Sequence, residues 1–257
     1  MTGSLIWDIL LLMISDITKQ IINKINSREK NKTDLDNERE YFIFHKYRFE
    51  IIFSLLRKYN KSDCLLDIGA HYMHGLLGAY YLGYKKLFGI DLDIFNSITI
   101  QRAKSIEATL KNCDLSKNNI PFEKEVFDII LLAETLEHLN FHPDKVFKEI
   151  SRILKSGGEI IITTPNIVRL NNRLKLILGK SIHQDIKKEY TPGTHYREYS
   201  VREIMYLLNK NNIDIKKLKY VDFNYPDSSI VKVIINKMVG FVFPKMKSNI
   251  IIVGRKK

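Results

Sequence analysis

The sequence predicts a doubly wound α/β domain with a mostly parallel sheet. Short apolar runs alternate along the chain with segments of helical periodicity, and the runs carry few charges. Strands of a parallel sheet have this continuous apolar pattern, because helices cover both faces of the sheet. The chain has 257 residues, of which 45% are hydrophobic, so it can build one large core and is not a disordered chain.

The main domain is expected over residues 39–257, after an N-terminal extension of residues 1–38. Apolar residues from Leu5 to Ile25 recur at helical spacing with lysines between them, which indicates an amphipathic helix, and a charged linker over 27–39 follows. The helix could pack on the domain or on a partner subunit, or contact a membrane surface. We expect neither a membrane span nor a signal peptide, because the apolar run is short and interrupted by Asp8.

The elements of the main domain are expected in the following order. A helix over about 39–58 precedes four apolar strands with the sequences CLLDIGA, KKLFGIDLD, FDIILLA and GEIIITTPN, and helical segments such as 145–154 lie between them. Ser200 is a typical N-cap residue, and a helix is expected from there to about Asn211. The strands IDIKKLKYV and NIIIVGRKK complete the predicted sheet.

The net charge of +12 and the cysteine content limit the classes of partner and compartment. The basic residues are scattered, so we attribute the charge to a solvated surface, with nucleic acid, anionic lipid and a phosphorylated substrate as alternatives. The two cysteines, Cys64 and Cys113, lie in apolar runs and are predicted to be buried thiols. Buried free thiols favour a reducing compartment, and we expect a cytoplasmic protein, with membrane-peripheral association as a variant.

Acidic residues stand at the ends of the predicted strands. The first strand ends in Asp67-Ile68-Gly69-Ala70, and the second ends at Asp91. Glycine lets a backbone approach a ligand closely, and an acid at the end of the second strand can accept both hydroxyls of a ribose. Further motifs follow in a fixed order, namely CDL, IPF, AETLEHL and RILKSGG.

This order of motifs resembles the class I S-adenosylmethionine-dependent methyltransferase family, with its Rossmann-like fold, over about residues 61–166. The segments TTPN, NRLKLILGK and HYREYS resemble the type associated with polysaccharide and glycolipid biosynthesis. The resemblance implies that S-adenosylmethionine is bound by Asp67, Gly69, Ala70, Asp91, Leu92, Asp114, Leu115 and Ala133. Within this set, Asp91 would hold the ribose, and Asp114 with the backbone of Leu115 would contact adenine.

The loop after the first strand departs from the family pattern. The family has glycines at two positions where this chain has His71 and Met73. A sulfonium cofactor has no pyrophosphate and needs fewer glycines than a dinucleotide, so we interpret the loop as altered but still able to bind cofactor. The alternative is a methyltransferase-like domain that binds no cofactor and acts as a binding module.

Candidate catalytic residues follow the strand FDIILLA. Glu134, Glu137 and His138 would share one face of a helix, and His195 could join them as a fourth ligand of Mg²⁺ or Mn²⁺. The pattern is similar to the E-x-x-E-H of metal-dependent O-methyltransferases that act on quinone precursors and on RNA 3′ ends. Without a metal, His138 would accept the proton, or the acids would only mark a helix N-terminus.

The sequence therefore predicts a methyltransferase that O-methylates a small-molecule or glycan-linked acceptor, with a sugar as the leading hypothesis. RNA 2′-O-methylation and quinone-type O-methylation are the alternative reactions, and nucleic acid is the less favoured partner. Residues 166–199 are expected to cover the acceptor side as an insertion after the fifth strand of the family pattern. The arginines of this insertion, Arg169, Arg173 and Arg197, would suit a phosphorylated acceptor or form surface ion pairs.

Overall fold

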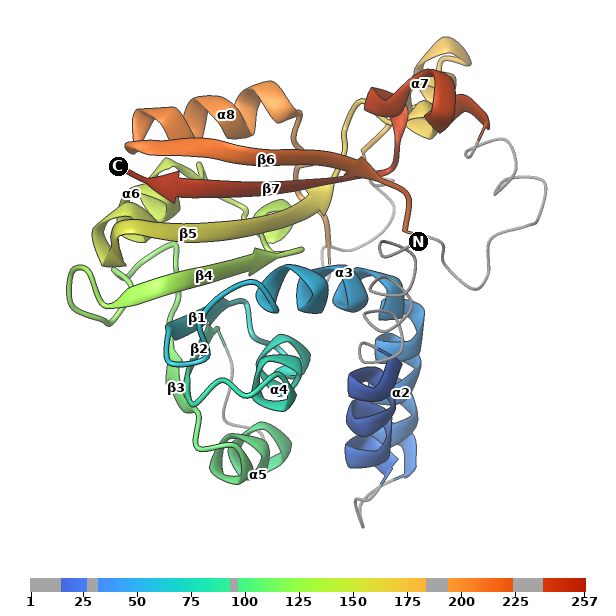
Figure 1. Cartoon of the computed structure of the whole chain (residues 1–257). Coiled ribbons are helices and arrows are strands. Elements are labelled where there is room, and N and C mark those ends of the chain that lie inside the picture. The colour runs from blue at the N-terminus through green and yellow to red at the C-terminus, as the bar shows by residue number, and fades with distance from the viewer. Residues whose placement is uncertain (1–14, 27–31, 93–96, 184–193, 224–237) are drawn as a thin grey trace, which may run out of the picture. The chain divides into compact units, whose positions relative to one another are not determined.

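The computed structural model describes residues 15–26, 32–92, 97–183, 194–223 and 238–257 (Figure 1). The chain divides into two compact units. The first unit comprises residues 1–65 and 70–112, and the second comprises residues 66–69 and 113–257.

Seven strands form one sheet with the order β3-β2-β1-β4-β5-β7-β6. Their bounds are β1 Cys64–Ile68, β2 Lys86–Asp91, β3 Thr109–Asn112, β4 Phe127–Ala133, β5 Leu154–Pro165, β6 Ile213–Val221 and β7 Asn249–Lys256. The pairs β2–β3 and β4–β5 are parallel, whereas β7 runs antiparallel to both β5 and β6. The predicted doubly wound, mostly parallel sheet is therefore confirmed. Strand β3 was not predicted from the sequence, because it is a short edge strand whose residues are mostly exposed and polar.

The described helices flank these strands. They are an unlabelled helix over 15–26, α2 Lys32–Phe44, α3 Lys46–Leu56, α4 His74–Tyr81, α5 Ser97–Ser105, the 3₁₀ helix η1 Leu136–His138, α6 Asp144–Ile153, α7 Leu170–Ile177, α8 Val201–Lys210, a short helix over 238–242 and the 3₁₀ helix η2 Pro244–Met246. Among these helices, none is long and apolar enough to cross a membrane.

Helix α8 begins where the sequence predicts, at the N-cap Ser200. The Ser200 hydroxyl accepts a hydrogen bond from the backbone N–H of Glu203, and the Glu203 carboxylate accepts one from the backbone N–H of Ser200. This reciprocal capping box satisfies two backbone donors that the first turn of a helix leaves unpaired. The apolar face of α8, with Ile204 and Leu208 fully buried, lies along β6 in the second unit (Figure 1).

The described part of the N-terminal extension packs on protein. Ile17, Ile21 and Ile25 lie on one face of the helix over 15–26, and their side chains are buried. This face is the apolar face that the sequence predicts. Residues 1–14 lie outside the described residues, so the predicted membrane contact of the N-terminal segment stays a prediction.

Helix α2 occupies most of the segment that the sequence predicts to be a linker. It begins at Lys32, and its polar sequence lacks a strong apolar face. Two described side chains of α2 are fully buried within the first unit. That of Phe42 stacks on the ring of Phe49, and that of Glu38 is charged. Its carboxylate accepts hydrogen bonds from Arg102 of α5 at 2.7 Å and lies 3.0 Å from Nε2 of His74 of α4. These tertiary contacts hold a helix that local sequence preferences alone do not indicate.

We expect Glu38→Gln to destabilise the protein by about 3–5 kcal/mol, because the substitution leaves the buried Arg102 guanidinium without its counter-charge. Urea unfolding followed by circular dichroism measures this difference. Glu40→Gln is the matched control, since Glu40 lies on the same helix with its side chain exposed, and its effect should stay within about 0.5 kcal/mol. Equal effects of the two substitutions would contradict a structural role for Glu38.

We expect the free energy of unfolding to fall as the pH is lowered below about 6.5, and His74 to be one cause. Burial lowers the pKa of His74, and this effect exceeds the opposing influence of Glu38. The unfolded state therefore takes up a proton at a pH where the folded state still excludes it. Urea unfolding over this pH range should show a shallower decline for His74→Gln than for the wild type, and identical slopes would contradict the assignment.

Candidate active site

The loop that follows β1 begins with a glycine that no other residue could replace without a shift of its neighbours. Gly69 has a φ of 80°, and a Cβ atom there would lie 2.3 Å from Oγ1 of Thr135. The Thr135 hydroxyl donates a hydrogen bond to the carbonyl oxygen of Ile68 at 3.0 Å. Within the second unit, the end of β1 is therefore packed tightly against the residues that follow β4.

The loop keeps a glycine-like backbone at the two positions where the family pattern has glycine. His71 and Met73 have φ values of 40° and 61°, in the left-handed region that side chains other than glycine rarely adopt. The backbone N–H of His71 donates a hydrogen bond to Oδ2 of Asp91 at 2.8 Å, and that of Leu92 donates to Oδ1 at 2.7 Å. The loop of the first unit thus fixes the orientation of the acid predicted to hold the ribose.

Helix α2, which precedes this loop in the sequence, contacts it through an aromatic side chain. The ring of Tyr41 lies 5.5 Å, centroid to centroid, from the rings of both His71 and Tyr72. The carbonyl oxygen of Tyr72 accepts a hydrogen bond from Arg102, the partner of the buried Glu38. Sequence reasoning missed Glu38, Tyr41 and Arg102 as residues that support the loop, because each is distant from it in the sequence and none belongs to a motif.

The remaining residues predicted to bind cofactor occupy the ends of strands or the turns after them. Asp67 is nearly buried at 6% exposure on β1, and Ala133 ends β4 opposite Thr163 of β5. Asp114 lies in the turn after β3, where its carboxylate accepts hydrogen bonds from Ser116 and Lys117. These contacts lower the pKa of Asp114 to about 2, so the side chain is ionised at neutral pH.

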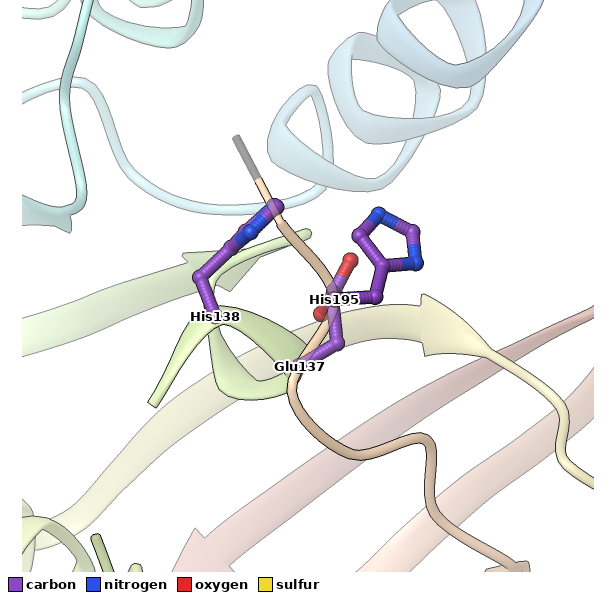
Figure 2. A group of neighbouring side chains, drawn as sticks. All are labelled: Glu137, His138 and His195. Atoms are coloured by element: carbon purple, nitrogen blue, oxygen red, sulfur yellow. The ribbon is translucent and has the colours of Figure 1, made fainter. Parts of the chain in front are cut away.

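Three of the four predicted metal ligands come together in the second unit. Glu137 and His138 lie on the 3₁₀ helix η1, and His195 lies on the segment that resumes at Thr194 (Figure 2). One ligand atom from each of these side chains lies within 4.8 Å of the others. Two ligands of a single ion are separated by at most about 4.4 Å, so small side-chain rotations would let all three bind one cation.

The hydrogen bonds of η1 define the chemistry of two of these groups. Nδ1 of His138 lies 2.9 Å from the carbonyl oxygen of Thr194. A carbonyl only accepts, so Nδ1 carries the hydrogen and the lone pair of the neutral ring is on Nε2, as required of a base or a metal ligand. The carboxylate of the buried Glu137 accepts a hydrogen bond from the hydroxyl of Thr164 at 3.0 Å. An imidazole lone pair beside a carboxylate fits a divalent cation.

The backbone of η1 also holds the third residue of the cluster in place. The carbonyl oxygen of Glu137 accepts hydrogen bonds from the N–H groups of Tyr196 at 2.9 Å and Arg197 at 3.3 Å. His195 immediately precedes these two donors, and its ring centroid lies 4.8 Å from that of His138. The segment after residue 193 is therefore attached to η1 on both sides of His195.

Glu134 is not part of the cluster, contrary to the four-ligand arrangement that the sequence predicts. The prediction assumed an α-helix over 134–138, in which residues three and four apart share a face. Instead, Glu134 has a left-handed φ of 51°, and only Leu136–His138 are helical, as a 3₁₀ turn. Glu134 is not among the residues whose ligand atoms lie within 4.8 Å of one another.

The arginines predicted to meet a phosphorylated acceptor have partners within the protein. Arg169 forms an ion pair with Glu198, and Arg197 forms one with Glu203. Burial alone would raise the pKa of Glu198, but the nearby His195 ring and the hydrogen bond and charge of Arg169 lower it to about 2. Arg169 and Arg197 are therefore members of ion pairs, as the alternative interpretation of these arginines expects.

Part of the chain matches the model of a known family. Residues 66–162 match the model of a family described as a methyltransferase domain. The match includes the loop after β1 and the η1 residues of the cluster. Residues 66–162 are therefore similar to a methyltransferase domain.

The chain spans less than half the length of the curated relatives that it matches. A ubiquinone biosynthesis O-methyltransferase of Pelagibacter ubique is 36% identical over 110 residues, which cover 42% of this chain and 43% of the relative. A sarcosine/dimethylglycine N-methyltransferase of Halorhodospira halochloris is 28% identical over 122 residues, covering 44% and 41%. The two relatives are named for an oxygen and a nitrogen acceptor, respectively.

A solved structure matches most of the fold. A SAM-dependent methyltransferase of Thermotoga maritima, described as a possible histamine N-methyltransferase, has a TM-score of 0.56 and 18% identity. The alignment covers 87% of this chain and 96% of that protein. The likeness shows the Rossmann-like architecture alone, because a fold of this kind accommodates many different acceptors.

We expect the wild-type protein to bind Mn²⁺ and His195→Ala to weaken this binding at least about tenfold, because the substitution removes one of three ligands. Isothermal titration calorimetry measures the affinity. Glu134→Gln is the matched control and should bind Mn²⁺ as the wild type does, since Glu134 lies outside the cluster. An equal loss in both variants would instead support the four-ligand arrangement.

Proposed function

We propose that this protein is an S-adenosylmethionine-dependent methyltransferase that transfers the methyl group to a hydroxyl oxygen. The observation that carries the proposal is the cluster of Glu137, His138 and His195. Its first two residues follow β4 within the region that matches a methyltransferase domain. Open α/β sheets bind their ligands at the carboxyl ends of the strands, where this cluster lies.

The cofactor would be held by the acids at the strand ends. Asp91 would accept hydrogen bonds from the ribose hydroxyls, with its orientation maintained by the N–H groups of His71 and Leu92. Asp67 and Gly69 would line the methionine part, and Asp114 with Leu115 would contact the adenine. The left-handed backbone at His71 and Met73 supports cofactor binding by this loop in the absence of the family's glycines.

Methyl transfer is an in-line displacement, which the protein assists by positioning and proton removal. The acceptor oxygen bonds to the methyl carbon as the carbon–sulfur bond breaks, and the bonding pair returns to sulfur to give S-adenosylhomocysteine. The acceptor hydroxyl must lose its proton, and Nε2 of His138 is the base in a metal-free reaction. Mg²⁺ or Mn²⁺ held by Glu137, His138 and His195 would lower the pKa of the hydroxyl instead.

A quinone-precursor hydroxyl is the acceptor class best supported by the comparisons. The relative from Pelagibacter ubique is named for ubiquinone biosynthesis. The stretch from Glu134 to His138 is similar in sequence to the E-x-x-E-H of metal-dependent O-methyltransferases, although only Glu137 and His138 belong to the cluster. A sugar or glycan intermediate, the leading hypothesis from the sequence, stays a prediction. The ion pairs of Arg169 and Arg197 provide no separate support for a phosphorylated or RNA acceptor.

We expect Asp91→Ala to weaken S-adenosylhomocysteine binding by about 1–3 kcal/mol, because it removes a charged acceptor of two hydroxyl donors. His71→Gly should retain the affinity, since glycine adopts the positive φ readily and keeps the N–H that faces Asp91. Calorimetric titration of the folded variants measures both effects. Wild-type affinity in Asp91→Ala would place the ribose elsewhere.

We expect methyl transfer to a prenylated catechol to stop when a chelator is added and to resume with Mg²⁺ or Mn²⁺. Glu137→Gln and His138→Ala should both abolish the reaction, because each removes a ligand of the proposed ion. The measurement is the formation of S-adenosylhomocysteine, with a nucleotide-linked sugar as the comparison acceptor. Full activity in the chelator would leave His138 as a metal-free base, and methylation of the sugar alone would favour the glycan acceptor.

A further inference from the structure

Two short segments of the second unit expose large apolar side chains. On α7 and directly after it, Leu174, Leu176, Ile177 and Leu178 have exposed fractions of 47%, 59%, 79% and 68%. Over 238–243, Met238, Phe241, Val242 and Phe243 have exposed fractions of 67%, 88%, 64% and 54%. Soluble monomers rarely expose such groups of apolar residues unless the surface contacts a partner or a membrane.

Both segments are attached to one point of the fold, the residue Asn166 that follows β5. The Asn166 side-chain amide donates hydrogen bonds to the carbonyl oxygens of Lys245 and Lys247, at 3.0 and 2.8 Å. The backbone N–H of Arg169, the N-cap residue of α7, donates to the carbonyl oxygen of Asn166. Figure 1 shows α7 and the helix over 238–242 at the same end of the sheet. We call these two segments, 170–178 and 238–243, the apolar tip.

The two stretches that form and flank the apolar tip carry charges of one sign only, although Glu198 pairs with Arg169 and Asp222 accepts a hydrogen bond from the backbone N–H of Ser248. The stretches 166–183 and 238–248 contain no aspartate or glutamate, and their basic residues are Arg169, Arg173, Lys175, Lys180, Lys245 and Lys247. Apolar side chains flanked by lysine and arginine are typical of segments that enter the interface of an anionic bilayer. A second copy of the chain fits less well, because a symmetric contact would bring two basic surfaces together.

The apolar tip is also connected to the candidate active site within the second unit. Arg169 is paired with Glu198, whose other oxygen lies 3.8 Å from Nδ1 of His195, one of the three residues of the cluster. Arg169 is the N-cap residue of α7, the helix that exposes Leu176 and Ile177. Glu198 therefore connects the start of this helix to His195 of the cluster. Insertion of the tip would bring these residues close to the membrane surface.

We propose that the apolar tip docks the protein on an anionic lipid surface. The basic residues would contact the headgroups, and the apolar side chains, with Ile177 and Phe241 the most exposed of each segment, would enter the acyl boundary. If the proposed function holds, the docked protein would take its acceptor from the membrane. The acceptor would then be a hydroxyl on a lipid-soluble or lipid-linked molecule.

The test is co-sedimentation of the full chain with phosphatidylcholine vesicles, with and without phosphatidylglycerol. We expect the wild type to sediment with the anionic vesicles, and the double variant Ile177→Ser/Phe241→Ser to bind at least about tenfold more weakly. Tyr206→Ser is the matched control, because Tyr206 is 62% exposed on α8, away from both segments in the sequence, and should bind as the wild type does. Lys175→Glu/Lys245→Glu should weaken binding to the anionic vesicles.

Wild type that stays in the supernatant with anionic vesicles, or a double serine variant that binds them fully, would overturn the proposal. Sedimentation velocity without lipid measures the oligomeric state of the same variants. A wild-type dimer that the serine substitutions dissociate would show that the apolar tip contacts a second copy of the chain instead. S-adenosylhomocysteine affinity measured on the same variants separates this inference from the proposed function. A protein that binds vesicles but not S-adenosylhomocysteine would support the docking surface and contradict the methyltransferase proposal.

Discussion

The buried carboxylate of Glu38 constrains the first unit more than any other single group. A charge without access to water must be neutralised and hydrogen-bonded where it lies, and Arg102 and His74 meet that requirement from two other helices. Arg102 in turn donates to the carbonyl oxygen of Tyr72. Three helices and the loop after β1 are therefore held by one network, and a shift of any of these elements would leave a charge uncompensated.

The second unit holds its candidate chemistry by backbone hydrogen bonds. The carbonyl oxygen of Glu137 accepts from two successive N–H groups after His195, and the carbonyl oxygen of Thr194 faces the ring of His138. Two segments far apart in the sequence thus define the positions of all three side chains of the cluster. Glu198, three residues after His195, forms an ion pair with Arg169 at the start of α7, and this ion pair also helps to hold His195.

Sequence patterns predicted the elements that depend on local signals. The apolar strands and the Ser200 cap were found because burial on both faces and N-capping act within a few residues. Strand β3 and the first part of helix α2, residues 32–38, were missed, since β3 is a polar edge strand and this part of α2 is held by the buried Glu38. Residues 39–44 of α2 fall within the helix expected over about 39–58. Nothing in the sequence indicated the left-handed backbone at Glu134, which removes that residue from the predicted ligand set.

The position of β7 in the sheet has a consequence for the order in which the chain can fold. Strand β7 lies between β5 and β6 and pairs with both, although both precede it in the sequence. While the chain is being synthesised, β6 and the facing edge of β5 have no partner strand until residues 249–256 emerge. Unpaired strand edges promote misassociation, so this half of the sheet passes through an aggregation-prone stage that ends when β7 pairs with both strands.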